Sequence, residues 1–126
     1  MQLNHTIIHC THAQTSAQVL AEILGRPAPQ HCGPFWVVET DNGVQIDYDE
    51  VHHAIEPQHY AFLITEPEFD QVLARVQAKA LRIWADPMQS REGAFNRNDG
   101  GRAFYFEDPD RHLMEVLTVP YGGWKK

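Results

Sequence analysis

The chain is poor in cysteine. Only Cys10 and Cys32 occur among its 126 residues, and they form no CxxC unit. The sequence therefore offers no disulfide framework, and a hydrophobic core must hold the fold. With 43% hydrophobic residues, a chain of this length has enough apolar surface to bury such a core. We expect one compact domain over residues 1–126.

Positive charge is also scarce, and long apolar runs are absent. The chain has 10 Lys and Arg against 17 Asp and Glu, a formal net charge of −7, and its basic residues are scattered. A nucleic-acid partner needs a basic patch that neutralises phosphates, so we exclude such a partner. No apolar run approaches the roughly 20 residues of a membrane span, and the N-terminus lacks the basic and apolar regions of a signal peptide. We expect a cytoplasmic protein without a membrane partner.

The sequence does contain a pattern that occurs twice. Apolar residues first alternate as in a strand, then recur at helical spacing, and then alternate again in short runs. The first repeat covers about residues 1–50, and its strands are expected at residues 2–10, 35–39 and 44–48. The second repeat covers about residues 57–120, and its strands are expected at residues 58–65, 81–84, 103–107 and 112–118. Each repeat is a strand, a helix and up to three strands, which predicts an α+β fold.

Both repeats begin with a histidine and end with a carboxylate. His5 and His59 lie in the first strands, and superposing the two hairpins on Glu39 and Glu107 brings Asp47 onto Glu115. Strand alternation places these polar residues on the sheet face that points away from the helix. One possibility is that this face is simply solvated, as one face of many antiparallel sheets is.

The neighbours of Glu115 favour a metal site instead. Leu113 and Leu117 lie on the same face of the strand as Glu115, and a carboxylate buried among leucines is costly unless it is paired or bound to a metal. Two imidazoles and one carboxylate leave coordination positions open on Mn, Fe, Ni or Zn. The sequence therefore predicts one divalent metal ion as cofactor.

Several segments resemble the vicinal oxygen chelate superfamily. This superfamily includes glyoxalase I, extradiol dioxygenases, fosfomycin-resistance transferases and bleomycin-resistance proteins. The similar segments are Asn4-His5, HYAF at residues 59–62 and FYFEDPDRHLME at residues 104–115. The resemblance covers nearly the whole chain, and its motifs are most similar to the fosfomycin-resistance branch.

The resemblance implies a fold, a set of ligands and an assembly. The fold would be two βαβββ modules that form one domain with a cupped mixed sheet around the metal. The ligands would be His5, His59 and Glu115, and Asp47 lies where glyoxalase I has a fourth ligand. Small members of the superfamily commonly pair, so the resemblance also implies a homodimer whose metal sites take ligands from both chains.

The implied activity is that of a metal-dependent enzyme acting on a small oxygen-chelating substrate. It would be a lyase or isomerase, a transferase or a dioxygenase, with Glu115 and Tyr105 as catalytic residues. The alternative is a non-catalytic drug-binding protein similar to the bleomycin-resistance proteins. A phosphonate substrate is disfavoured, because Ala85, Ile7 and an arginine-free tail stand where the fosfomycin-resistance enzymes have anion contacts.

Residues 85–101 show no convincing periodicity. Loops longer than about 12 to 15 residues are uncommon in compact domains and are often functional. We expect this segment to be a lid over the site. Under such a lid, Arg91, Arg97 and Arg102 could meet a substrate carboxylate, and Trp36, Trp84 and Tyr105 could line the cavity. The alternative for each residue is a solvated arginine or an aromatic side chain of the core.

Overall fold

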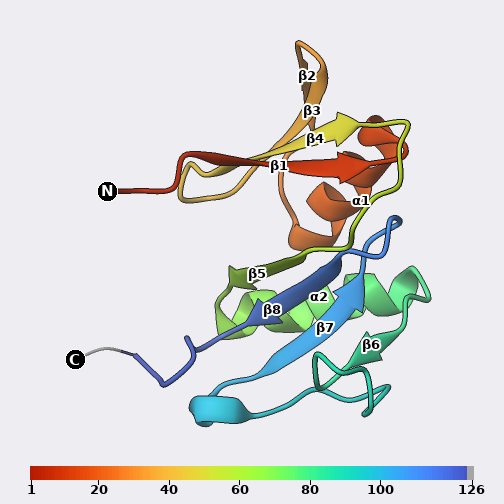
Figure 1. The fold of residues 1–126 in the computed structure, drawn as a ribbon. Coiled ribbons are helices and arrows are strands. Elements are labelled where there is room, and N and C mark those ends of the chain that lie inside the picture. Colours follow the sequence, from red (N-terminus) through yellow and green to blue (C-terminus); the bar gives the residue numbers. More distant parts are fainter. Residues whose placement is uncertain (125–126) are drawn as a thin grey trace. The chain divides into compact units, whose positions relative to one another are not determined.

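The computed structural model describes residues 1–124 and divides the chain into two compact units, Met1–Glu56 and Pro57–Lys126 (Figure 1). The first unit contains, in chain order, β1 (His5–Cys10), α1 (Ala13–Leu24), β2 (Gln30–Cys32), β3 (Phe35–Glu39) and β4 (Gln45–Glu50). The second contains β5 (His59–Leu63), α2 (Glu66–Ala78), β6 (Ile83–Trp84), the 3-10 turn η1 (Asn98–Gly100), β7 (Ala103–Glu107) and β8 (Leu113–Leu117). Each unit is a βαβββ module, so the predicted α+β fold is confirmed.

Each unit has one mixed sheet of four strands with the same topology. The strand orders are β1-β4-β3-β2 and β5-β8-β7-β6, and the first strand of each unit lies parallel to the last. Parallel strands need a long crossover connection, and the helix of each unit lies within it. The predicted order of elements lacks β2. Its residues Gln30–Cys32 are all exposed and show no apolar alternation, so no sequence signal marks this strand.

The core of each unit lies between its helix and one face of its sheet. In the first unit Ile8, Val38 and Tyr48 are fully buried, while His5 and His9 on the alternate positions of β1 are exposed. In the second unit α2 runs along the sheet (Figure 1), and Phe69 of α2 meets Phe104 of β7 edge to face with ring centroids 5.3 Å apart. The opposite face of each sheet is therefore left for the polar residues.

The two helices begin in different ways. In the sequence, Thr15 or Ser16 can serve as the cap of the first helix, and Gly25 followed by Pro27 marks its end. In the structure α1 already begins at Ala13, and Ser16 is buried within it. The first amide of α1, that of Ala13, donates instead to Glu50 Oε1 at the end of β4, 3.2 Å away. A carboxylate from another strand thus replaces the local cap. The predicted end of this helix at Gly25 is confirmed, with φ 69°.

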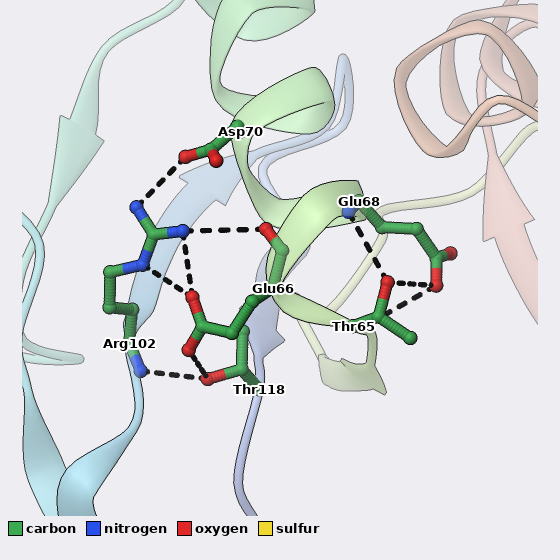
Figure 2. Close-up of polar contacts among 6 residues, drawn as sticks. All are labelled: Thr65, Glu66, Glu68, Asp70, Arg102 and Thr118. Atoms are coloured by element: carbon green, nitrogen blue, oxygen red, sulfur yellow. Dashed lines mark hydrogen bonds and ion pairs between the residues drawn. The ribbon is translucent and has the colours of Figure 1, made fainter.

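The second helix begins with a capping box. Thr65 Oγ1 accepts from the Glu68 amide at 3.3 Å, and Glu68 Oε1 accepts from the Thr65 amide at 3.2 Å (Figure 2). We predict that Thr65→Ala lowers the free energy of unfolding by about 1 kcal/mol, because the Glu68 amide loses the hydroxyl oxygen that accepts from it, and the Glu68 carboxylate loses the hydroxyl that donates to it. Thr65→Ser should retain most of the stability, since serine keeps the oxygen. Urea denaturation of the three proteins measures both effects, and equal loss in both variants would contradict a capping role.

In the part of the chain that the structure describes, no helix has the length and apolar character required to cross a membrane.

Candidate functional site

Glu115 is a fully buried carboxylate in the middle of β8. Its side chain has 0% exposure, although it lies on the sheet face that points away from α2. Its cross-strand neighbours are Ala61 on β5 and Tyr105 on β7. His59 lies two residues before Ala61 on the same strand and therefore on the same face of the sheet. The predicted pair therefore meets, with His59 Nε2 3.1 Å from Glu115 Oε1.

A second contact of His59 fixes its tautomer. The Nδ1 atom lies 2.9 Å from the backbone oxygen of Leu113. A carbonyl oxygen can only accept, so Nδ1 must carry a proton and donate it. A neutral imidazole then presents a lone pair at Nε2, directly toward the carboxylate oxygen of Glu115. Two acceptors at this distance repel each other unless a proton or a metal cation lies between them.

This pair fits a divalent metal ion. Metal–ligand distances of about 2.0–2.2 Å place two ligand atoms about 2.8–3.6 Å apart at angles between 90° and tetrahedral. The separation of 3.1 Å between Nε2 and Oε1 lies in this range. A histidine that binds a metal also usually donates its other ring N–H to a carbonyl or carboxylate, as His59 does. Within residues 1–124, however, no group of three His, Cys, Asp or Glu side chains is arranged to hold a metal.

The other two predicted metal residues, His5 and Asp47, lie in the first unit. His5 is exposed, and its Nδ1 lies 2.7 Å from Asn4 Oδ1, so Nδ1 donates and Nε2 again presents a lone pair. Asp47 is 9% exposed, and its Oδ1 has no hydrogen-bond partner among the described residues. The parallel register pairs His5 with Gln45 and Ile7 with Asp47. His5 and Asp47 therefore share one face of their sheet, as the alternation predicted.

Tyr121 is a site residue that the sequence reasoning missed. Its hydroxyl donates to both oxygens of Glu115, at 2.6 and 2.7 Å. The hydroxyl of Tyr105 lies 3.1 Å from that of Tyr121. Because the single proton of Tyr121 is directed at Glu115, Tyr105 must be the donor in this second bond. The only sequence signal for Tyr121 was a Pro-Tyr-Gly-Gly turn directly after the glutamate strand.

Both tyrosines remain neutral donors. Burial raises the pKa of the Tyr105 hydroxyl above its ordinary value. Burial raises the pKa of Tyr121 as well, and its hydrogen bond to Glu115 adds to this rise. The ring of Tyr105 also lies 5.9 Å from the ring of His59. Tyr105 thus lies beside the His59–Glu115 pair, where it can contact a molecule bound there.

Arg102 does not have the substrate-binding role considered for it from the sequence. Instead of facing a substrate carboxylate, its guanidinium binds Glu66 at 2.7 Å and Asp70 at 2.9 Å on α2 (Figure 2). It also lies 4.2 Å above the ring of Phe69. Arg102 precedes Ala103 on β7, and alternation directs it toward the helix, on the face opposite Glu115. Arg102 therefore stabilises the packing of α2 rather than binding a substrate.

The remaining predicted residues lie in both units. Trp84 is buried on β6 and is paired in register with Tyr105, whereas Trp36 lies in the first unit and stacks on His31 with centroids 4.7 Å apart. The guanidinium of Arg97 lies 5.3 Å from the centroid of the Phe95 ring.

His112 has a structural role. Its side chain is 1% exposed, and its Nδ1 accepts from the Gln58 amide at 2.9 Å.

The predicted lid, residues 85–101, makes several internal hydrogen bonds. Asp86 accepts from the amides of Ser90 and Arg91, at 3.1 and 2.8 Å. The buried Asn96 side chain donates to the Ala85 carbonyl at 2.8 Å. These bonds order the segment although it has little regular structure. Movement of the segment over the site stays a prediction.

Comparison with known proteins completes the description of the site. No family model matches the chain. The chain is 50% identical to the oxidase ChaP-H1, whose structure is similar with a TM-score of 0.95 over 98% of this chain and 99% of that chain. The chain is also 29% identical over 127 residues to the glutathione transferase FosA of Serratia marcescens. The aligned region covers 90% of this chain and 78% of that enzyme.

A more distant similarity concerns the fold alone. The structure of a glyoxalase/dioxygenase from Nostoc punctiforme has a TM-score of 0.70 and 18% identity, over 94% of this chain and 91% of that chain. The two βαβββ modules and the FosA relative agree in one assignment. The chain belongs to the vicinal oxygen chelate superfamily.

Proposed function

We propose that this protein is a metal-dependent oxidase in which His59, Glu115 and His5 hold one divalent ion. Of the candidate ions Mn, Fe, Ni and Zn, the first three can change oxidation state and so suit an oxidase, whereas Zn cannot. The contact between His59 Nε2 and Glu115 Oε1 at 3.1 Å carries the proposal. When His59 is neutral both atoms are acceptors, because the hydrogen bond from His59 Nδ1 to Leu113 leaves the Nε2 lone pair directed at the carboxylate. A divalent cation satisfies both atoms at once and leaves coordination positions open for a substrate.

The third ligand would come from the first unit. His5 has the same arrangement as His59, because its Nδ1 is tied to an oxygen acceptor and its Nε2 is left for a metal. We propose that the two units belong to one domain, residues 1–126, and that two copies form a homodimer. His5 of one copy would then complete the His59–Glu115 pair of the other. Asp47, whose buried Oδ1 lacks a described partner, is the candidate for a fourth ligand.

The similarity to an oxidase favours oxidation among the reactions of the superfamily. The oxidase ChaP-H1 is 50% identical along nearly the whole of both chains, whereas the glutathione transferase FosA is 29% identical. Ala85 and Ile7 also lie at positions where the fosfomycin-resistance branch would bind an anion. Arg102 forms ion pairs with Glu66 and Asp70, so its charge is already neutralised within the protein. We therefore favour a substrate that chelates through neutral or weakly acidic oxygens over a phosphonate.

The chain's own residues would position this substrate. When bound, the metal ion supplies Lewis-acid attraction for the substrate oxygens and brings them close to molecular oxygen. Tyr121 holds the Glu115 carboxylate with Oε1 toward His59. The ring of Tyr105 offers an apolar surface beside His59, which suits a planar substrate. The raised pKa of Tyr105 keeps its hydroxyl protonated, and on releasing its hydrogen bond to Tyr121 this hydroxyl could donate to a developing oxyanion.

Removal of one ligand tests the proposal. The wild-type protein, purified without chelator, should contain about one divalent ion per chain, and His59→Ala should lose it together with oxygen uptake on phenolic and hydroxyketone substrates. His52→Ala is the matched control, because it removes an exposed histidine from the first unit. Metal analysis and an oxygen electrode provide the two measurements.

The outcomes separate the two functions that the sequence left open. Equal metal content in His59→Ala and the wild type would contradict the proposal. Tight binding of an aromatic ligand without metal and without oxygen uptake would instead support the non-catalytic drug-binding alternative.

A further inference from the structure

The tyrosine that contacts Glu115 projects from a tight turn after β8. The carbonyl of Pro120 accepts from the Gly123 amide at 2.9 Å, which closes a four-residue turn. Gly122 occupies the third position with φ 79°, the conformation that a type II turn requires there. Tyr121 therefore lies at the second position of the turn, and its hydroxyl reaches back to the glutamate. We call residues 120–123 the tail turn.

A side chain of the preceding loop holds the tail turn. Asp99 Oδ2 accepts from the Gly122 amide at 3.1 Å, a hydrogen bond strengthened by the charge of the carboxylate. Asp99 lies in η1 with a positive φ of 56°, a conformation that aspartate tolerates better than most residues. The contact therefore joins residues 98–100, far from Glu115 in the chain, to the turn that carries Tyr121.

The base of this loop packs tightly against the end of β8. A Cβ atom added at Gly101 would lie 2.7 Å from both Thr118 Oγ1 and Val119 Cγ2. The amide of Gly101 donates to the Asn98 carbonyl at 3.0 Å, which closes η1 immediately before this contact. The close approach of Gly101 to the Thr118 and Val119 side chains and the closure of η1 thus help to place Asp99, whose carboxylate accepts from the tail turn.

We propose that Asp99 is a positioning residue for the metal site. By holding Gly122 it keeps Tyr121 where its hydroxyl donates to both oxygens of Glu115, and Tyr121 in turn keeps Oε1 directed at His59. The inference rests on the proposed function, because the orientation of Glu115 matters most when the carboxylate binds a metal. Loss of a hydrogen bond to a metal ligand typically lowers metal affinity about 10–100-fold, and loss of the Asp99 anchor should act through that same bond.

Three variants test this chain of contacts. Asp99→Gly removes the acceptor and fits the positive φ, whereas Asp99→Asn keeps an acceptor oxygen in the same place. Tyr121→Phe removes the hydroxyl directly. Calorimetric titration with Mn²⁺ should show affinity lowered about 10–100-fold in Tyr121→Phe, lowered in the same direction in Asp99→Gly, and close to wild type in Asp99→Asn.

A double variant separates positioning from a general structural role. If Asp99 acts through Tyr121, Asp99→Gly should weaken Mn²⁺ binding in the wild type but have little further effect in Tyr121→Phe. Unchanged Mn²⁺ affinity in Asp99→Gly would overturn the inference. An equal loss of affinity in both backgrounds would overturn it as well, because Asp99 would then act independently of the tyrosine.

Hydrogen exchange distinguishes failure of this inference from failure of the proposed function. In metal-free protein the amides of residues 120–124 should exchange faster in Asp99→Gly than in the wild type and Asp99→Asn. Unchanged exchange would overturn the anchoring of the tail turn whatever the metal result. If the wild type binds no Mn²⁺, the proposed function fails and the role of Asp99 in metal binding fails with it, while faster exchange would still establish the anchor itself.

Discussion

Replacing Glu115 with glutamine should abolish metal binding while leaving the fold intact. Glutamine has nearly the same shape, and its amide oxygen can still accept from Tyr121, but a neutral amide is a much poorer ligand than a carboxylate. Loss of a direct ligand should cost more than the roughly 10–100-fold that loss of a supporting hydrogen bond costs. Mn²⁺ titration calorimetry measures the affinity, and circular dichroism checks the fold.

Glu107→Gln provides the matched control for this experiment. Glu107 is a carboxylate of the neighbouring strand β7, and its Oε1 accepts from Gln89 Nε2 at 2.9 Å rather than contacting His59. The Glu107→Gln protein should bind Mn²⁺ like the wild type. Comparable affinity in Glu115→Gln and Glu107→Gln would contradict the assignment of Glu115 as a ligand.

Replacing Phe104 with alanine should give the largest loss of stability. Phe104 is 0% exposed, and its ring packs against Phe69 at 5.3 Å and Phe106 at 6.0 Å. Truncation removes this buried surface and leaves a cavity between α2 and the sheet, which typically costs about 3–5 kcal/mol. Native domains are stable by only about 5–15 kcal/mol, so the variant should be only marginally folded. Urea denaturation followed by circular dichroism measures the change.

Met88→Ala tests whether this effect reflects burial rather than loss of side-chain volume in general. Met88 is 87% exposed in the segment between β6 and η1. Its truncation should change the free energy of unfolding by no more than about 0.5 kcal/mol. Similar losses in Phe104→Ala and Met88→Ala would show that Phe104 is not part of the core.

Most of the fold could be predicted because its strands carry a strong period-two signal. Phe104 and Phe106 on β7, and Met114 and Val116 on β8, are fully or almost fully buried, and each alternates with residues of the other face. This alternation located both strands to within one residue. The start of α1 was placed too late, because its cap is Glu50, a residue distant in sequence that only the folded sheet brings near.

The candidate site was only partly visible in the sequence. Glu115 could be recognised because a carboxylate between two leucines implies a partner, and the duplicated pattern pointed to His59. Tyr121 could not, since its hydroxyl reaches Glu115 only through a turn whose position depends on a contact with Asp99. Arg102 was a candidate for substrate binding because it is a basic residue near a long loop, whereas its position before Ala103 directs it toward α2.

The most direct test of the central claim is a crystal structure grown with Mn²⁺ and measured for anomalous scattering. The proposed function predicts an anomalous peak about 2.0–2.3 Å from both His59 Nε2 and Glu115 Oε1. It also predicts that His5 binds the same ion as the third ligand. A peak bound elsewhere, or His59 and Glu115 still in direct contact at saturating Mn²⁺, would contradict it.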